Sequence, residues 1–165
     1  MKAIYAGSFS PPTFGHLDVI RRGAAMFDEV IVAVLSQSEK KYLFTPEMRA
    51  DMLERITADI PGVRVVSSTG LLVDLARREG ADVILRGLRD ASDLTFEMQL
   101  AEANRMISGF ETVFLPSLPQ YSRISSTIVR DCALHGAPIG GMVPEEIVDE
   151  VYAVYAALKH TERKY

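Results

Sequence analysis

The residues best suited to chemistry lie near the start of the chain, in the segment GSFSPPTFGH from Gly7 to His16. Its glycines, prolines and serines are typical of a loop, and His16 stands where a helical pattern begins. Backbone N–H groups at a helix N-terminus bind phosphate, and the helix dipole there disfavours a charged imidazole. We therefore expect a neutral His16 that donates a hydrogen bond to a phosphate oxygen. The alternative for a single histidine is that it only caps the helix.

The sequence RGLR places two arginines, Arg86 and Arg89, directly after an apolar run of strand length. An arginine at the end of a buried strand is costly unless its guanidinium meets an anion. A substrate phosphate is one such anion, and a salt bridge to Asp90, Asp93 or Glu97 is the alternative.

Two further polar segments carry anion-binding groups. The pair Lys40–Lys41 is by itself typical of a solvated surface loop. The segment YSRISST, residues 121–127, offers hydroxyls and backbone donors at another expected helix start, which favours a second phosphate site. Ordinary N-capping by Ser125 or Ser126 is the alternative, and the two roles are compatible.

The chain offers no cysteine or serine nucleophile with an evident paired base. Its three histidines, His16, His135 and His160, are too scattered for a zinc site, and no residue is predicted to ligate a metal. Phosphate-binding groups without a base fit transfer between phosphates, because the attacking oxygen is then already anionic. Catalysis would consist of positioning and charge stabilisation.

The elements that must position these residues alternate along the chain. The expected strands are 2–6, 29–35, 63–66, 83–85 and 112–115, and the expected helices are 16–27, about 45–57, 71–79, 93–106, 125–135 and 144–159. Consecutive strands joined by helices are parallel, with right-handed crossovers. We therefore predict a doubly wound, Rossmann-like α/β fold with a five-stranded parallel sheet and helices on both faces. It forms a single domain over residues 1–165, and the helices from about residue 125 onward pack on it.

Ligands of such sheets bind beyond the carboxyl ends of the strands. This rule brings together four loops, 7–15, 36–44, 86–90 and 116–125, which hold most of the polar residues described above.

Composition narrows the class of protein. The chain has 165 residues, 48% of them hydrophobic, a formal net charge of −4 and one cysteine. We expect a soluble, cytoplasmic protein without an internal disulfide, signal peptide or membrane span. The negative charge argues against nucleic acids and membrane surfaces as partners.

Several motifs together resemble a known family. The segment Gly7–His16 fits G-S-F-x-P-x-T-x-G-H, which resembles the T/HxGH signature of the nucleotidylyltransferases, and ISST (124–127) resembles their second signature. The stretches GLLVDLARREGADVILRGLR (70–89), DLTFEMQLAEANR (93–105) and QYSRISST (120–127) resemble the bacterial phosphopantetheine adenylyltransferases over nearly the whole chain. RGLR followed by FEMQ is the specific signal, since the T/HxGH motif alone indicates only the superfamily.

The resemblance implies that ATP and 4′-phosphopantetheine form dephospho-CoA and pyrophosphate, and that Mg²⁺ accompanies the triphosphate. It also implies a cytoplasmic homohexamer, with coenzyme A as an open candidate for a feedback ligand. By position, Ser8, Lys40, Leu72 and Arg86 would hold the pantetheine substrate, and His16 would stabilise the transition state. The residues implied to hold ATP are Ser8, Phe9, His16, Gly87, Leu88, Arg89, Glu97, Tyr121, Ser122, Arg123, Ile124, Ser125, Ser126 and Thr127.

The chain departs from this family at three places. The family usually has Asp at the position of Ser10, an apolar residue at Arg123, and S-S-S-x-V-K where this chain reads SSTIVR (125–130). The segment SSTIVR is more similar to the corresponding segment of the nicotinate-mononucleotide adenylyltransferases. Nucleotidylyl transfer to another phosphorylated acceptor, such as nicotinate mononucleotide, is therefore the first alternative, and a nonenzymatic nucleotide-binding protein of the same fold is the second.

Overall fold

The computed structural model describes residues 1–36 and 42–162, with side chains up to residue 157. Its strands are β1 (Lys2–Gly7), β2 (Glu29–Leu35), β3 (Val63–Ser68), β4 (Val83–Leu88) and β5 (Thr112–Pro116). Its helices are α1 (Phe14–Ala24), α2 (Pro46–Thr57), α3 (Leu72–Glu79), α4 (Ala91–Ser108), α5 (Ser126–His135) and α6 (Glu145–Glu162). All strand pairs are parallel, in the order β3-β2-β1-β4-β5, which confirms the predicted doubly wound fold.

The two faces of the sheet follow from the alternation of side chains along each strand. On β1, Ala3 and Tyr5 belong to one buried cluster, which also contains residues of α1, α2, α5 and α6. Ile4 and Ala6 belong to a second buried cluster on the opposite face, with Val73 and other residues of α3. The strands are therefore apolar on both faces, as the near-continuous apolar runs indicate.

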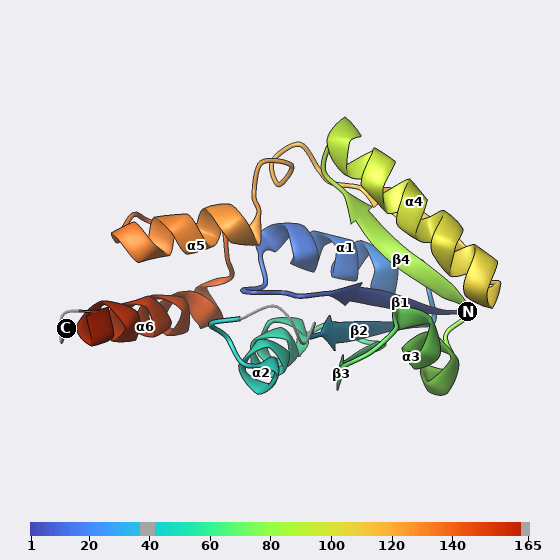
Figure 1. Cartoon of the computed structure of the whole chain (residues 1–165), viewed down its shortest axis with the longest axis horizontal. Helices are drawn as coiled ribbons and strands as arrows, with labels where there is room; N and C mark the ends of the chain where they lie inside the picture. Colours follow the sequence, from blue (N-terminus) through green and yellow to red (C-terminus); the bar gives the residue numbers. More distant parts are fainter. Residues whose placement is uncertain (37–41, 163–165) are drawn as a thin grey trace.

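The strand order reverses between β1 and β4. From β1 the chain proceeds outward to β2 and β3, then returns to place β4 on the other side of β1. A doubly wound sheet binds its ligands at such a switch point, outside the carboxyl ends of the strands. The end of β1 points toward α5 and α6, which lie beyond that edge of the sheet (Figure 1).

Several predicted boundaries differ from the structure by a few residues, and two of these differences affect the site. Helix α1 begins at Phe14 rather than at His16, because Thr13 is its N-cap. Strand β4 continues through Leu88, so the first three residues of RGLR belong to the strand and not to a loop. The ladder with β5 is the reason: Arg86 pairs with Phe114, and the pairing continues to the ends of both strands.

Gly87 shows why a glycine stands in the middle of this strand. A Cβ atom there would lie 2.8 Å from Cγ2 of Val19 on α1. The missing side chain therefore lets α1 pack directly against β4, beside the pocket described below.

Helix α4 lies along β4 and has an unusual orientation (Figure 1). None of its residues is fully buried, and its less exposed positions include the polar residues Asp93 and Glu97. Its apolar residues face outward, with Phe96 59% exposed and Met106 80% exposed. The helix thus turns polar groups toward the domain and apolar groups toward solvent.

No helix in the described part of the chain has both the length and the apolar character needed to cross a membrane.

Candidate active site

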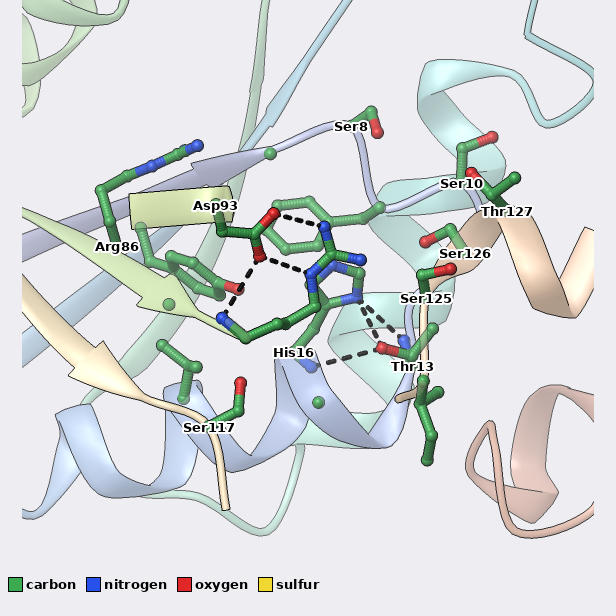
Figure 2. Close-up of a pocket in the computed structure, with 18 of the residues that line it drawn as sticks. Ser8, Ser10, Thr13, His16, Arg86, Asp93, Ser117, Ser125, Ser126 and Thr127 are labelled. Carbon is green, nitrogen blue, oxygen red and sulfur yellow. Dashed lines mark hydrogen bonds and ion pairs between the residues drawn. The ribbon is translucent and has the colours of Figure 1, made fainter. Parts of the chain in front are cut away.

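A cavity of about 840 Å³ opens at the carboxyl ends of β1 and β4. Residues of β1, the loop after it, α1, β4, α4 and the start of α5 line it, together with Tyr42 and Leu43 before α2. In Figure 2, Ser125, Ser126 and Thr127 lie on one side of the cavity, Arg86 lies on the other, and His16 lies between them.

Most of the residues implied by the sequence meet in this cavity. Those that line it are Ser8, Phe9, His16, Arg86, Gly87, Arg89, Glu97, Ile124, Ser125, Ser126 and Thr127. They come from four separate segments of the chain, so the topology predicted from the sequence brings the motifs together.

Other implied residues do not line the cavity, and one cannot be placed. In the described part of the chain, Leu72, Leu88, Tyr121, Ser122 and Arg123 are not among the lining residues. Leu72 is the first residue of α3, Tyr121 stacks on the ring of Phe14 with centroids 6.0 Å apart, and Arg123 is exposed. Lys40 lies outside the described residues.

The hydrogen bonds of His16 determine which ring nitrogen carries its proton. His16 is the third residue of α1, and its Nδ1 accepts from the backbone N–H of Thr13 at 3.0 Å. The side chain of Thr13 in turn accepts from the backbone N–H of His16, which completes a capping box. Because Nδ1 is an acceptor, the neutral ring carries its proton on Nε2. His16 therefore caps the helix and keeps one donor for a ligand, so the two alternatives are compatible.

The imidazole of His16 is neutral at physiological pH, as predicted. Desolvation at the cavity wall, with the positive charges of Arg89 and Arg86, lowers its pKa from the ordinary 6.5 to about 4. The prediction rested on the helix dipole, whereas desolvation is the largest cause and the arginines are the next.

Both arginines of RGLR are paired with carboxylates of α4. Arg86 donates from Nε and Nη2 to Glu97, at 2.6 Å each, and from Nη1 to the carbonyl oxygen of Ala6 at 2.6 Å. Arg89 donates from Nε and Nη2 to Asp93 at 2.7 and 2.8 Å. The salt bridges named as the alternative are thus present, and all four side chains also line the cavity.

Arg130 is a cavity residue that the sequence analysis missed. Its Nη1 donates to the carbonyl oxygen of Ser10 at 2.7 Å, and its Nη2 donates to Oγ1 of Thr127 at 3.1 Å. No carboxylate of the described residues pairs with it, so it contributes an uncompensated positive charge to the cavity wall. Its spacing of three residues from Thr127, within one turn of α5, was the signal that could have identified it.

The serine-rich segment forms a helix start, as expected. The hydroxyl of Ser125 accepts from the backbone N–H of Ile128 at 3.2 Å, so this residue is the N-cap of α5. The hydroxyl of Ser126 donates to the carbonyl oxygen of Pro11 at 2.7 Å and ties α5 to the first loop. The cavity is therefore bordered by the N-termini of α1 and α5, each of which favours an anion.

Comparisons with known proteins agree with this geometry. Residues 4–132 match the model of the family described as cytidylyltransferase-like. The phosphopantetheine adenylyltransferase of Prochlorococcus marinus (strain NATL1A) is 47% identical, over 92% of this chain and 96% of that protein. The enzyme of the same name from Symbiobacterium thermophilum is 49% identical, over 87% of this chain and 90% of that protein.

The fold also matches a solved structure. A nicotinate-nucleotide adenylyltransferase candidate from Vibrio parahaemolyticus superposes with a TM-score of 0.68 and 19% identity, covering 93% of this chain and 94% of that one. This likeness concerns the fold alone. The nearly complete sequence matches, together with a cavity that contains both signature motifs, lead to one conclusion: the chain belongs to the phosphopantetheine adenylyltransferase family, within the cytidylyltransferase-like superfamily.

Proposed function

We propose that this chain transfers the adenylyl group of ATP to 4′-phosphopantetheine, forming dephospho-CoA and pyrophosphate in coenzyme A synthesis. The observation that carries the proposal is the cavity at the switch point, where a neutral His16 meets Arg86, Arg89 and Arg130. Relatives that are nearly half identical over almost the whole chain support this acceptor.

The reaction needs little from the protein beyond positioning. A phosphate oxygen of the acceptor attacks the α-phosphorus of ATP, and the bond between that phosphorus and the bridging oxygen breaks. The bonding electron pair leaves with pyrophosphate. The attacking oxygen is already anionic, so no general base is required. His16 donates from Nε2 to an oxygen of the α-phosphate, where negative charge accumulates in the transition state.

The cavity divides between the two substrates. We assign the acceptor to Ser8 and Arg86, which line the cavity, and, from the resemblance alone, to Leu72 and Lys40. We assign the nucleotide to the ATP-binding residues that the resemblance implies. We add Arg130 to the nucleotide side, because its charge is not compensated by a described carboxylate and it adjoins Thr127.

Mg²⁺ enters the proposal as a companion of the triphosphate. Mg²⁺ is commonly held by substrate phosphates, water and one or two carboxylates, so it needs no dedicated protein cage. The described residues contain no cluster of three His, Cys, Asp or Glu side chains, and the two cavity carboxylates, Asp93 and Glu97, are paired with arginines. This donor set fits an ion bound mainly by phosphate oxygens, whose charge would neutralise the leaving pyrophosphate.

We also propose that the chain assembles with copies of itself through α4, as the hexamer implied by the resemblance. An outward apolar face of Leu94, Phe96, Met98, Met106 and Ile107 on one helix exceeds what scattered exposed residues explain. A cytoplasmic location and feedback by coenzyme A stay predictions.

An acceptor assay tests the proposed function. The protein is incubated with ATP, Mg²⁺ and either 4′-phosphopantetheine or nicotinate mononucleotide, and pyrophosphate release is measured. We expect release with 4′-phosphopantetheine only. Release only with nicotinate mononucleotide would move the chain to the alternative acceptor, and ATP binding without release in either mixture would favour a nonenzymatic binder.

A further inference from the structure

Arg49, on α2, is a fully buried arginine behind the cavity, and neither signature motif contains it. Its side chain is 0% exposed, and it is not among the residues that line the cavity. Arginine is rarely buried to this extent without a specific set of partners, because its guanidinium is costly to remove from water. The partners of the Arg49 guanidinium must therefore explain why an arginine is buried here.

The guanidinium of Arg49 joins separate parts of the cavity wall. Its Nη1 donates to the carbonyl oxygens of Ser8, at 2.6 Å, and Leu35, at 3.3 Å. Its Nη2 donates to the hydroxyl of Ser36 at 2.7 Å, and its carbon Cζ lies 4.4 Å from the ring centroid of Tyr42. Ser8 and Tyr42 both line the cavity. A planar group with five donors can hold these segments at once, whereas a lysine cannot.

The contact with Ser8 has a consequence for the next residue. The peptide bond between Ser8 and Phe9 is trans, so its C=O and N–H point in opposite directions. Arg49 is not among the residues that line the cavity, so we infer that its hydrogen bond turns the C=O away from the cavity and the N–H of Phe9 toward it. No described residue accepts a hydrogen bond from that N–H.

The backbone at Phe9 needs such support. Its φ is +47°, a left-handed conformation that costs a non-glycine residue free energy on the order of 1 kcal/mol or more. Packing of the buried ring against Tyr5 and His16 holds the side chain of Phe9, with ring centroids 5.5 and 5.0 Å apart. The peptide on its N-terminal side is held by Arg49.

We propose that Arg49 is a positioning residue that holds the Ser8–Phe9 peptide so that the Phe9 N–H donates to a phosphate oxygen of the nucleotide. The inference rests on the proposed function for the identity of the nucleotide, but not for the identity of the acceptor. Arg49 itself touches no substrate.

Titration calorimetry with ATP in the absence of acceptor tests the proposal. We expect Arg49→Met to weaken ATP binding by about ten-fold or more, the usual effect of one lost hydrogen bond to a charged group. Arg49→Lys should restore part of the affinity, because an ammonium still reaches one carbonyl oxygen. A matched titration with inorganic pyrophosphate reports on the phosphate contact without the adenosine and should show the same order of variants.

Arg55→Met is the matched control. Arg55 is also on α2, but it pairs on the surface with Asp51 and Glu150 and does not line the cavity. The control should bind ATP as the wild type does. Ser36→Ala removes one hydrogen-bond partner of Arg49 and leaves Ser8 unchanged, so it should weaken ATP binding less than Arg49→Lys does. This variant replaces Arg49→Met in the test if Arg49→Met does not fold.

A lower melting temperature with unchanged ATP and pyrophosphate affinity in Arg49→Lys and Ser36→Ala would overturn the proposal and leave Arg49 a purely structural residue. A failure of the proposed function is recognised separately, since wild-type protein would then bind ATP or pyrophosphate without transferring to 4′-phosphopantetheine.

Discussion

At the scale of single residues, His16 combines a structural role with a chemical one. Its Nδ1 closes the capping box of α1, and its Nε2 keeps a proton for the ligand. The two roles can be separated, because Gln at the same helical position also completes a capping box with Thr13.

We predict that His16→Gln lowers turnover strongly while it preserves the fold. The loss of one donor to transition-state charge typically costs on the order of 100- to 1000-fold in rate. His16→Ala should lose the same activity and, in addition, about 1 kcal/mol of stability from the missing cap. Steady-state kinetics measures the turnover and thermal melts measure the stability, while an ATP titration shows whether each variant still binds the nucleotide. Turnover near the wild-type value in His16→Gln would mean that His16 only caps α1 and does not stabilise the transition state.

The lowered pKa of His16 predicts how stability depends on pH. In the unfolded chain the imidazole takes up a proton below about pH 6.5, whereas in the folded chain it does so only near pH 4. As the pH falls through this interval, the unfolded state binds more protons, and the wild type loses folding free energy. Unfolding free energies measured from pH 7 to pH 4 should therefore fall more steeply for the wild type than for His16→Gln. Parallel curves would contradict the burial of this imidazole.

At the scale of elements, β4 and α4 form one side of the site as a unit. The strand and the residue after it supply Arg86 and Arg89, and the helix supplies the carboxylates that orient them, Glu97 and Asp93. The side chain of Glu97 is only 12% exposed. Removal of its partner Arg86 would therefore leave an unpaired and nearly buried carboxylate.

The two arginines should affect different substrates. Arg86→Ala should raise mainly the Michaelis constant for 4′-phosphopantetheine, and Arg89→Ala mainly that for ATP, each by roughly ten- to a hundred-fold. Arg86→Lys should restore part of the effect, because lysine keeps the charge but loses the planar pair of donors. Kinetics with each substrate varied, beside thermal melts, test this division. A lower melting temperature with both Michaelis constants unchanged would mean that the salt bridges are structural only.

At the scale of the whole molecule, α4 places the site next to the surface proposed for assembly. Its inner positions hold the arginines of the cavity, while its outer positions expose Phe96 and Met98. We predict that Phe96→Glu lowers the molar mass measured by light scattering from about six chains to fewer. Glu54→Gln, an exposed change on α2, is the control and should leave the mass unchanged. A wild-type mass of one chain would refute the assembly.

The sequence by itself determined the order of elements, the parallel sheet and the loops that meet at its edge. Apolar periodicity and turn residues are local signals, and chain connectivity then permits few topologies. For this reason the sequence alone was enough to assign the segments containing His16, Arg86 and Ser125 to one cavity.

Only the tertiary structure decided how those residues are held. It showed that β4 extends through Leu88 and that Glu97 and Asp93 form salt bridges with the two arginines. It also showed that Arg49 donates a hydrogen bond to the first loop from outside the cavity. These contacts join residues on different elements or depend on how a helix is turned toward the sheet. A local pattern does not encode them, because the burial that makes each contact favourable exists only once the chain is packed.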